Sequence, residues 1–325
     1  MNAFGTNLKV QLWGESHGAA VGVLIDGCPA GITVLPNDFD KDLLRRKSGA
    51  RGTTERKESD KPVIQSGIHN NHTTGSPISI LFHNKDMRSQ DYNFREHPRP
   101  GHADFTAHKK YFGYNDDRGA GHFSGRITAG LVAAGVIAKK LLPNINIKAK
   151  LTEVGGITDI GKAIQNAIDS EDSVGGIIQC SVKGLPVGLG EPFFDSVESL
   201  VSHAVFSVPG IRGIEFGSGF DAAQMKGAEH NDIIKNSHGT SITNHAGGVN
   251  GGITNGNELK FRVAVKPTSS ITSIQNTFHF GENRVKELAV KGRHDACFAL
   301  RVPVIIEAVT ALVLADLKLR RYDKN

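Results

Sequence analysis

The stretch KVQLWGESHGAAVGVLID, residues 9–26, decides how the start of this chain folds. Its apolar segments, 9–13 and 21–26, predict two strands that pair antiparallel. Between them Gly14 and Gly18 bracket Glu15-Ser16-His17, so an acid, a hydroxyl and an imidazole lie on a tight connection where backbone approaches whatever binds. The stretch is therefore either the wall of a site or an ordinary turn whose histidine caps a neighbouring group.

Composition indicates one large, glycine-rich globular domain. The chain has 325 residues, of which 38 are glycine, well above the average usage of about 7%. Hydrophobic residues make up 38% and charged residues 22%, which excludes a disordered or fibrous protein. No segment has the low complexity of a linker, so we predict a single domain over residues 1–325.

Charge and cysteine content narrow the class of partner. The chain carries 38 basic and 33 acidic side chains, a net charge of +5, which suits an anionic ligand or nucleic acid. Aromatic residues are only 6%, and no basic helix offers a stacking platform, so a small anion is favoured over nucleic acid. The cysteines, without a CxxC pair, predict neither a disulfide framework, a zinc site nor any other metal centre: Cys28, Cys180 and Cys297.

The chain also lacks a leader-like start and a run of about 18 apolar residues. We therefore expect a cytoplasmic protein that does not enter the membrane.

Two apolar helices among many strands predict the fold class. The segment 124–142 is rich in small residues and ends at Pro143, and the segment 304–321 is apolar over most of its surface. We expect an α+β fold in which a buried helical layer is covered by sheets. Further strands are expected over 32–35, 63–68, 78–83, 147–154, 176–183, 210–220 and 259–265, and helices over 39–46, 160–169 and 196–206, the last capped by Asp195.

The segment 48–60 is polar, punctuated by glycine and too charged to be buried. We expect a mobile surface loop, or alternatively a lid whose guanidinium groups close on phosphate or carboxylate groups.

Several clusters set histidine, arginine or lysine among glycines and turn residues. They are 45–56, 99–104, 118–126, 244–252, 266–270 and 291–297. Residues 119–124 precede a predicted helix, where free backbone amides suit an oxyanion or a phosphate. Spacing alone leaves open whether these clusters converge on one site or are plain surface loops.

Taken together, six ordered motifs resemble the chorismate synthase family, from about residue 8 to residue 318. They are Gly14-Glu15-Ser16-His17-Gly18, Arg99-Pro100-Gly101-His102-Ala103-Asp104, Ser124-Gly125-Arg126, Asn244-His245-Ala246-Gly247-Gly248, Lys266-Pro267-Thr268-Ser269-Ser270 and Gly292-Arg293-His294-Asp295. The resemblance implies conversion of 5-enolpyruvylshikimate-3-phosphate to chorismate and phosphate, a redox-neutral 1,4-elimination that requires reduced FMN. It also implies a homotetramer and a β-α-β sandwich, in which the buried helical layer lies between antiparallel sheets. NADPH is implied as reductant where a member reduces its own flavin.

By position, the resemblance assigns roles to residues. His17 matches the histidine that protonates the departing phosphate, His102 the one near the flavin ring, and Asp295 the carboxylate that assists proton transfer to the flavin. Four arginines match substrate or NADPH contacts: Arg46, Arg51, Arg99 and Arg126. The residues matching FMN contacts are His122, Phe123, Ser124, Pro209, Gly210, Gly251, Lys266, Pro267, Thr268, Ser269, Ser270 and Arg293, of which Arg293 also matches an arginine lining the pocket.

One motif departs from the family pattern. Many members read Arg-Ser-Ser-Ala-Arg-Glu where this chain reads His122-Phe123-Ser124-Gly125-Arg126-Ile127, which loses an arginine, a hydroxyl and an acid. This departure predicts weaker FMN binding or a shifted phosphate contact. The alternatives are another flavin-dependent lyase on this scaffold, or a weakly active or non-catalytic relative that binds FMN or an anion.

Overall fold

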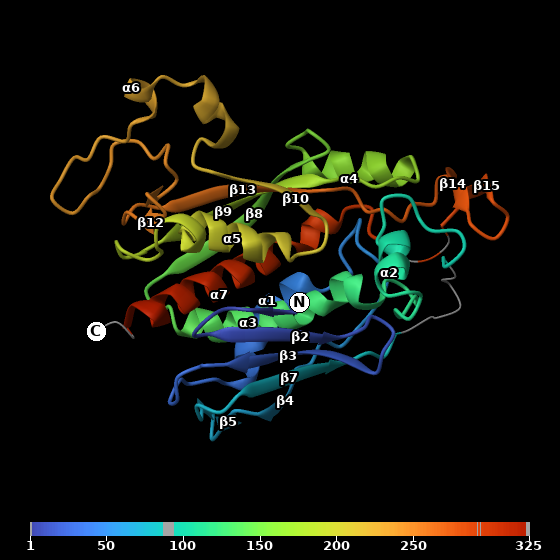
Figure 1. The fold of residues 1–325 in the computed structure, drawn as a ribbon, viewed down its shortest axis with the longest axis horizontal. Coiled ribbons are helices and arrows are strands. Elements are labelled where there is room, and N and C mark those ends of the chain that lie inside the picture. The colour runs from blue at the N-terminus through green and yellow to red at the C-terminus, as the bar shows by residue number, and fades with distance from the viewer. Residues whose placement is uncertain (1, 87–93, 291, 293, 323–325) are drawn as a thin grey trace.

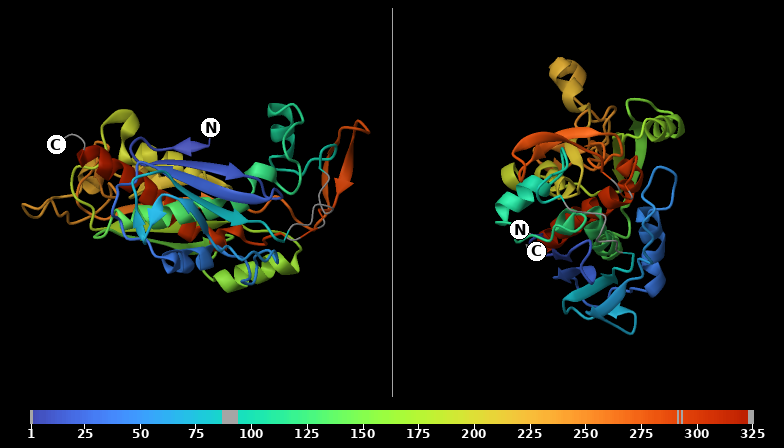
Figure 2. Two further views of the ribbon diagram at one scale, coloured as in Figure 1. Left: turned by 90° about the horizontal axis from the view of Figure 1, so that it is seen from below. Right: turned by 90° about the vertical axis from the view of Figure 1, so that its right-hand side faces the viewer.

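A helical layer separates two antiparallel sheets in the computed structural model (Figure 1). The structure describes residues 2–86, 94–290, 292 and 294–322. In the right-hand view of Figure 2, the sheet of the N-terminal half and the sheet of the C-terminal half lie on opposite sides of the central helices. The predicted α+β sandwich is confirmed.

The first sheet is built by the N-terminal strands. Its order is β1-β2-β3-β7-β4, with every pair antiparallel. In β3 every residue from Val21 to Val23 is buried, because helix α3 (Thr128–Lys140) packs against this central strand. The strands are β1 (Ala3–Phe4), β2 (Lys9–Gly14), β3 (Ala20–Asp26), β4 (Val63–Ser66) and β7 (Ile78–His83), beside the small ribbon of β5 (Ile68–His69) and β6 (His72–Thr73).

Helices α3 (Thr128–Lys140) and α7 (Pro303–Tyr322) form the centre of the molecule. A Cβ built on Gly135 of α3 would lie 2.4 Å from the Cβ of Ala308 in α7, so only glycine allows the helices this close. Every residue from Thr128 to Ala138 is buried. The small side chains of this segment therefore reflect tight packing between helices. Helix α1 (Asp40–Arg46) packs beside both.

The second sheet has the order β10-β13-β9-β8 and is also antiparallel. It packs on α7, and α5 (Val197–Phe206) covers α7 and β10. Helix α4 (Ile160–Asp169) lies against β8 at the outside. The strands are β8 (Asn146–Val154), β9 (Gly176–Lys183), β10 (Ile211–Phe216) and β13 (Leu259–Val265).

The remaining elements project from the sandwich. Helix α2 and the hairpin β14–β15 lie at one end, and the excursion that carries α6 lies at the other, near β11 and β12 (Figure 1). Their bounds are α2 (Asp104–Lys110), α6 (Gly227–His230), β11 (Val249–Asn250), β12 (Ile253–Thr254), β14 (Gln275–His279) and β15 (Arg284–Leu288).

Three local expectations were wrong. The segment 32–35 forms no strand: Thr33 makes one isolated bridge to His72, because Gly31 and Pro36 confine the chain to a short crossing of the β5–β6 ribbon. Helix α5 is capped by Ser196, whose hydroxyl accepts from Ser199 N at 3.0 Å, while Asp195 belongs to the preceding turn. The helix expected from residue 124 begins at Thr128, after a separate 3-10 turn.

Candidate active site

A cavity of about 1120 Å³ opens where loops from both sheets meet the beginning of α3. Small-molecule sites commonly measure about 300–1,000 Å³, so this cavity has room for more than one small ligand. Sixteen of the residues singled out in the sequence line it: His17, Arg46, Arg99, His102, His122, Phe123, Ser124, Arg126, Pro209, Gly210, Lys266, Pro267, Thr268, Ser269, Ser270 and Asp295. Separate loops therefore converge on one site.

Two of the predicted site residues that the structure describes, Arg51 and Gly251, are not part of this lining. Arg51 is exposed on a turn of the segment 48–60, and Gly251 lies in the turn between β11 and β12, with nothing within 4 Å of a Cβ built on it. Arg293 lies outside the described residues. The assignment of these three residues stays a prediction.

His17 is positioned by a contact between two glycine-rich turns. Ser16 N donates to Gly121 O at 2.9 Å, and His122 Nδ1 lies 2.8 Å from Gly14 O, which can only accept. The imidazole of His17 is buried against Gly119, whose φ is +69°. The opening turn is therefore a wall of the cavity.

His102 is held by a carboxylate that also binds Arg99. Asp104 Oδ1 lies 2.6 Å from His102 Nδ1, and Arg99 donates to both oxygens of Asp104, at 2.7 and 2.8 Å. Arg99 Nη2, which can only donate, lies 3.1 Å from the same Nδ1, but the carboxylate is closer and only accepts. The shorter contact therefore favours a proton on Nδ1, which leaves the lone pair of the neutral ring on Nε2. Burial is the main reason why the pKa of His102 is lowered, and the nearby cations Arg99 and Lys266 add to this. Asp104 acts in the opposite direction but does not cancel the lowering.

Arg99 is committed to protein partners. Besides Asp104, its guanidinium donates to Ser270 Oγ at 3.1 Å and Gly119 O at 2.7 Å, and it stacks 4.2 Å above the Phe94 ring. Its side chain thus joins the loops that carry His102, Gly119 and Ser270. A direct substrate contact by Arg99 stays a prediction.

Two buried cations share one carboxylate. Asp60 accepts from Arg46 Nη2 with one oxygen and from Arg126 Nη1 with the other. Burial lowers the pKa of Arg46 to about 10, although Asp60 acts in the opposite direction. Burial alone would raise the pKa of Asp60, but Arg46 and Arg126 together hold it below its usual value. Two guanidiniums and one carboxylate leave a net positive charge in this wall, which favours an anionic ligand.

Asp295 is fixed from two directions. It accepts from Thr54 N at 2.9 Å with one oxygen and from Arg301 Nη2 at 2.6 Å with the other. The Arg301 guanidinium lies 5.2 Å from the centre of the Phe298 ring, and both residues line the cavity. The segment that follows α1 thus reaches across to the segment that precedes α7.

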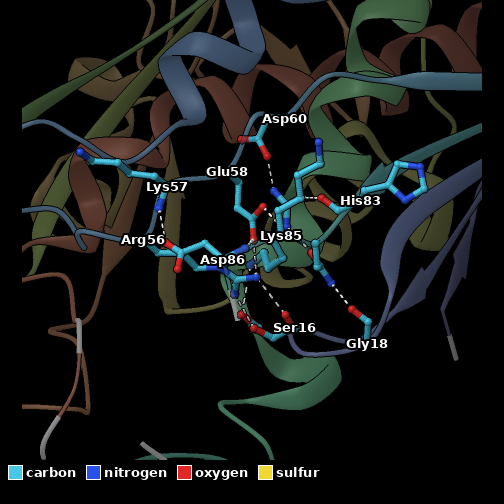
Figure 3. Close-up of polar contacts among 12 residues, drawn as sticks. Ser16, Gly18, Arg56, Lys57, Glu58, Asp60, His83, Lys85 and Asp86 are labelled. Carbon is cyan, nitrogen blue, oxygen red and sulfur yellow. Dashed lines mark hydrogen bonds and ion pairs between the residues drawn. The ribbon is translucent and has the colours of Figure 1, made fainter. Parts of the chain in front are cut away.

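The charged segment 48–60 is docked onto the opening turn (Figure 3). Arg56 donates to Ser16 Oγ at 2.8 Å and Ser16 O at 3.0 Å, and Glu58 accepts from Arg56 at 2.8 Å and from the amide of Lys85 at 3.0 Å. The side chains of Glu58 and Asp60 are 5% and 1% exposed, so the expectation that this segment is too charged to be buried fails for these two carboxylates, whereas Arg51, Glu55 and Lys57 are exposed as expected. Arg56 offsets the desolvation of the Glu58 carboxylate, and Arg46 and Arg126 offset that of Asp60.

The loop 266–270 packs on the loop that carries His102. Ser269 Oγ donates to Gly101 O at 2.7 Å and lies 2.5 Å from Lys266 Nζ. Burial, and after it Arg212, lowers the pKa of Lys266. Thr268 Oγ1 is buried without a hydrogen-bond partner among the described residues, which leaves a hydroxyl for a ligand.

Three residues of this site were given no role in the sequence: Asp60, Asn84 and Arg301. Arg56 stood there only as the end of the cluster 45–56. Asp60 is followed by Lys61 and Pro62, which lead into β4, and Arg301 lies two residues before Pro303. Their importance comes from the partners that tertiary folding provides. Over the described residues, no cluster of histidine, cysteine or carboxylate side chains could hold a metal ion, and no helix is long and apolar enough to cross a membrane.

Comparison with known proteins agrees with the site. The model of the chorismate synthase family matches residues 8–319. The chain is 61% identical over 327 residues to a chorismate synthase of Chitinophaga pinensis, covering 100% of this chain and 98% of the relative. It is 43% identical over 352 residues to one of Dehalococcoides mccartyi, covering 98% and 97%.

A solved structure shares the fold. A crystal structure of chorismate synthase superimposes with a TM-score of 0.76 at 24% identity, covering 98% of this chain and 93% of that chain. Together with the match of the family model, the sequence relatives settle the assignment: the chain belongs to the chorismate synthase family, and it is a lyase of aromatic amino-acid biosynthesis.

Proposed function

We propose that this enzyme converts 5-enolpyruvylshikimate-3-phosphate to chorismate and inorganic phosphate, with reduced FMN as cofactor. The reaction breaks one C–O bond to phosphate and one C–H bond and forms one C=C bond, so the substrate is neither oxidised nor reduced overall. The chain must therefore bind a ligand with three anionic groups, two carboxylates and a phosphate, and supply a proton to the leaving group.

The observation that carries this proposal is the convergence of His17, His102 and Asp295 on one cavity. These residues are separated by as many as 278 positions in the chain, counted from His17 to Asp295. Cations line the same cavity, and Arg46, Arg126 and Arg56 lie on the wall nearest the opening turn. Guanidinium groups suit planar carboxylate and phosphate groups.

His17 is the proposed acid. Histidine is a common general acid in enzymes, so the imidazole of His17 can carry the proton that the departing phosphate needs. The turn 14–18 is fixed by Gly121 and Arg56, which keeps the imidazole in one position. Such positioning lowers the barrier more than the presence of an acid alone.

The residues present fit a flavin mononucleotide. Lys266 offers a cation for its phosphate or ring oxygens, and the hydroxyl of Thr268, which has no partner among the described residues, offers a donor. When bound, reduced flavin supplies an electron-rich ring that assists C–O cleavage and takes up the substrate proton. Around it, His102 offers the Nε2 lone pair, and Asp295 offers a carboxylate held by Thr54 and Arg301.

Three further properties are part of the proposal. NADPH is the proposed reductant if the enzyme reduces its own flavin, with an external reductant as the alternative. Exposed aromatic side chains, among them Phe112, Tyr114, Phe193 and Phe194, support burial in the proposed homotetramer. The free, buried cysteines support a reducing cytoplasm as the location.

An anaerobic assay with photoreduced FMN and 5-enolpyruvylshikimate-3-phosphate tests the activity. We expect equal amounts of phosphate and chorismate. Flavin binding without phosphate release would contradict the proposal and favour the second candidate, a non-catalytic relative that binds FMN or an anion. The departure from the family pattern at residues 122–127 is the observation that favours this second candidate.

A further inference from the structure

Asn84 lies directly after β7 and has all three of its side-chain hydrogen bonds inside the protein. Its Nδ2 donates to Glu15 O at 3.0 Å and to Gly18 O at 2.7 Å, and its Oδ1 accepts from Arg126 Nε at 2.8 Å. Two carbonyls require the amide group on one side and a guanidinium requires the carbonyl oxygen on the other, so only one orientation of the amide fits. Asn84 is 7% exposed.

The two ends of this side-chain amide contact different parts of the site. The carbonyls of Glu15 and Gly18 bracket His17 in the opening turn, and Asn84 N adds a bond to Ala19 O at 3.0 Å. On the other side, Arg126 also binds Asp60 and donates to His83 O at 3.3 Å. Figure 3 shows these contacts from Gly18 across His83 to Asp60. Asn84 is thus the link between the His17 turn and the buried cations.

We propose that Asn84 is a positioning residue for the elimination, which fixes the His17 turn relative to Arg126. The inference rests on the proposed function, because that function gives His17 the role of acid and Arg126 that of anion contact. If Arg126 contacts the anionic substrate, the side-chain amide of Asn84 fixes the position of His17 relative to that substrate. A misplacement of about 1 Å between acid and leaving group can cost about 10²-fold in rate.

The chemistry of the amide separates this role from simple packing. Asn84→Asp has nearly the same shape and can still accept from Arg126, but a carboxylate cannot donate to the two carbonyls of the turn. In Asn84→Ser the side chain is uncharged and too short to bond both the turn carbonyls and Arg126. Arg126 keeps Asp60 and His83 O in both variants. We therefore expect a lower kcat, by about 10- to 100-fold, with a KM for the substrate that stays within about threefold.

Hydrogen exchange gives a second measurement that is independent of activity. In the full-length protein, both variants should exchange faster at the amides of residues 15–18, while the amides of β3 and β7 stay protected. Asn146→Asp, at an exposed position at the start of β8, is the matched control and should change neither kcat nor exchange at the turn. Arg126→Lys removes the Nε donor from the other side and should also speed exchange at 15–18.

The outcomes separate the two proposals. An active wild-type enzyme whose Asn84 variants keep kcat, or lose it without faster exchange at the turn, would overturn the role of Asn84. If the Asn84 variants do not fold, unchanged exchange at 15–18 in Arg126→Lys overturns it. A wild-type protein without phosphate release overturns the proposed function, whereas the exchange experiment still tests the link itself.

Discussion

The imidazole of His17 packs against the backbone of Gly119, so closely that a Cβ built on Gly119 would lie 2.5 Å from His17 Cε1 and 2.7 Å from Nδ1. No side chain fits between these two residues. The conformation of the turn 118–121 therefore determines where the proposed acid stands, although the two residues are far apart in the sequence.

Gly119→Ala should displace His17 and lower kcat by about 10²-fold. The residue also has a positive φ, so the substitution adds backbone strain of about 1 kcal/mol. Gly156→Ala is the matched control, because Gly156 has a φ of +80° and nothing within 4 Å of its Cβ. Steady-state kinetics and urea unfolding of both variants check this: equal losses of activity would show that strain, and not the contact with His17, causes the effect.

His17→Ala and His102→Ala should behave differently. The first removes the proposed proton donor to phosphate, so it should slow the elimination and leave FMN affinity nearly intact. The second removes the Nε2 lone pair beside the proposed flavin position, so it should change the absorption spectrum or the pH response of bound reduced FMN. Anaerobic spectroscopy and phosphate release measure the two effects, and identical behaviour of the variants would refute the division of roles.

Asp60→Asn should destabilise the protein by about 3–5 kcal/mol at pH 7, because it leaves Arg46 and Arg126 without their shared counter-charge. The pKa of Asp60 is lowered in the folded state, so its contribution is present above about pH 4 and is lost as pH falls through the folded value. The difference between wild type and variant should therefore narrow below about pH 4. Urea unfolding across pH checks this, and a constant difference would contradict it.

Arg56→Ala should lower kcat/KM by about tenfold or more, since Ser16 loses both of its guanidinium contacts next to His17. It also leaves Glu58 buried without its cation. Lys61→Ala, at an exposed position outside the cavity, is the control and should leave the kinetics unchanged. Arg56→Lys should restore only part of the activity, because an ammonium cannot reach Ser16 and Glu58 at once.

Phe123→Ser should tighten FMN binding if the departure from the family pattern weakens it. Phe123 is 40% exposed, lines the cavity and lies 6.4 Å from the Tyr111 ring, centre to centre. A serine would restore the hydroxyl that many members carry there. Isothermal titration with FMN measures the change, and an unchanged affinity would show that other contacts compensate.

The sequence was most informative where the pattern is local. Short apolar segments predicted β2, β3 and β9 nearly at their observed bounds, and the small residues before Pro143 predicted a closely packed helix. It failed at 32–35, where three apolar residues and one threonine between Gly31 and Pro36 form backbone hydrogen bonds with the neighbouring ribbon. Local pattern cannot show which partner a short segment will find.

By itself, the sequence determined the fold class, the helical layer between sheets and the candidate residues His17, His102 and Asp295, because these depend on periodicity and on motifs that stand close together in the chain. Only the tertiary structure decided how they are held: Asp104 for His102, Arg301 for Asp295, Asn84 for the turn of His17. It also decided that Asp60 and Glu58 are buried. Burying a charge is stable only beside a partner, and those partners come from segments that meet only when both sheets close around α3 and α7.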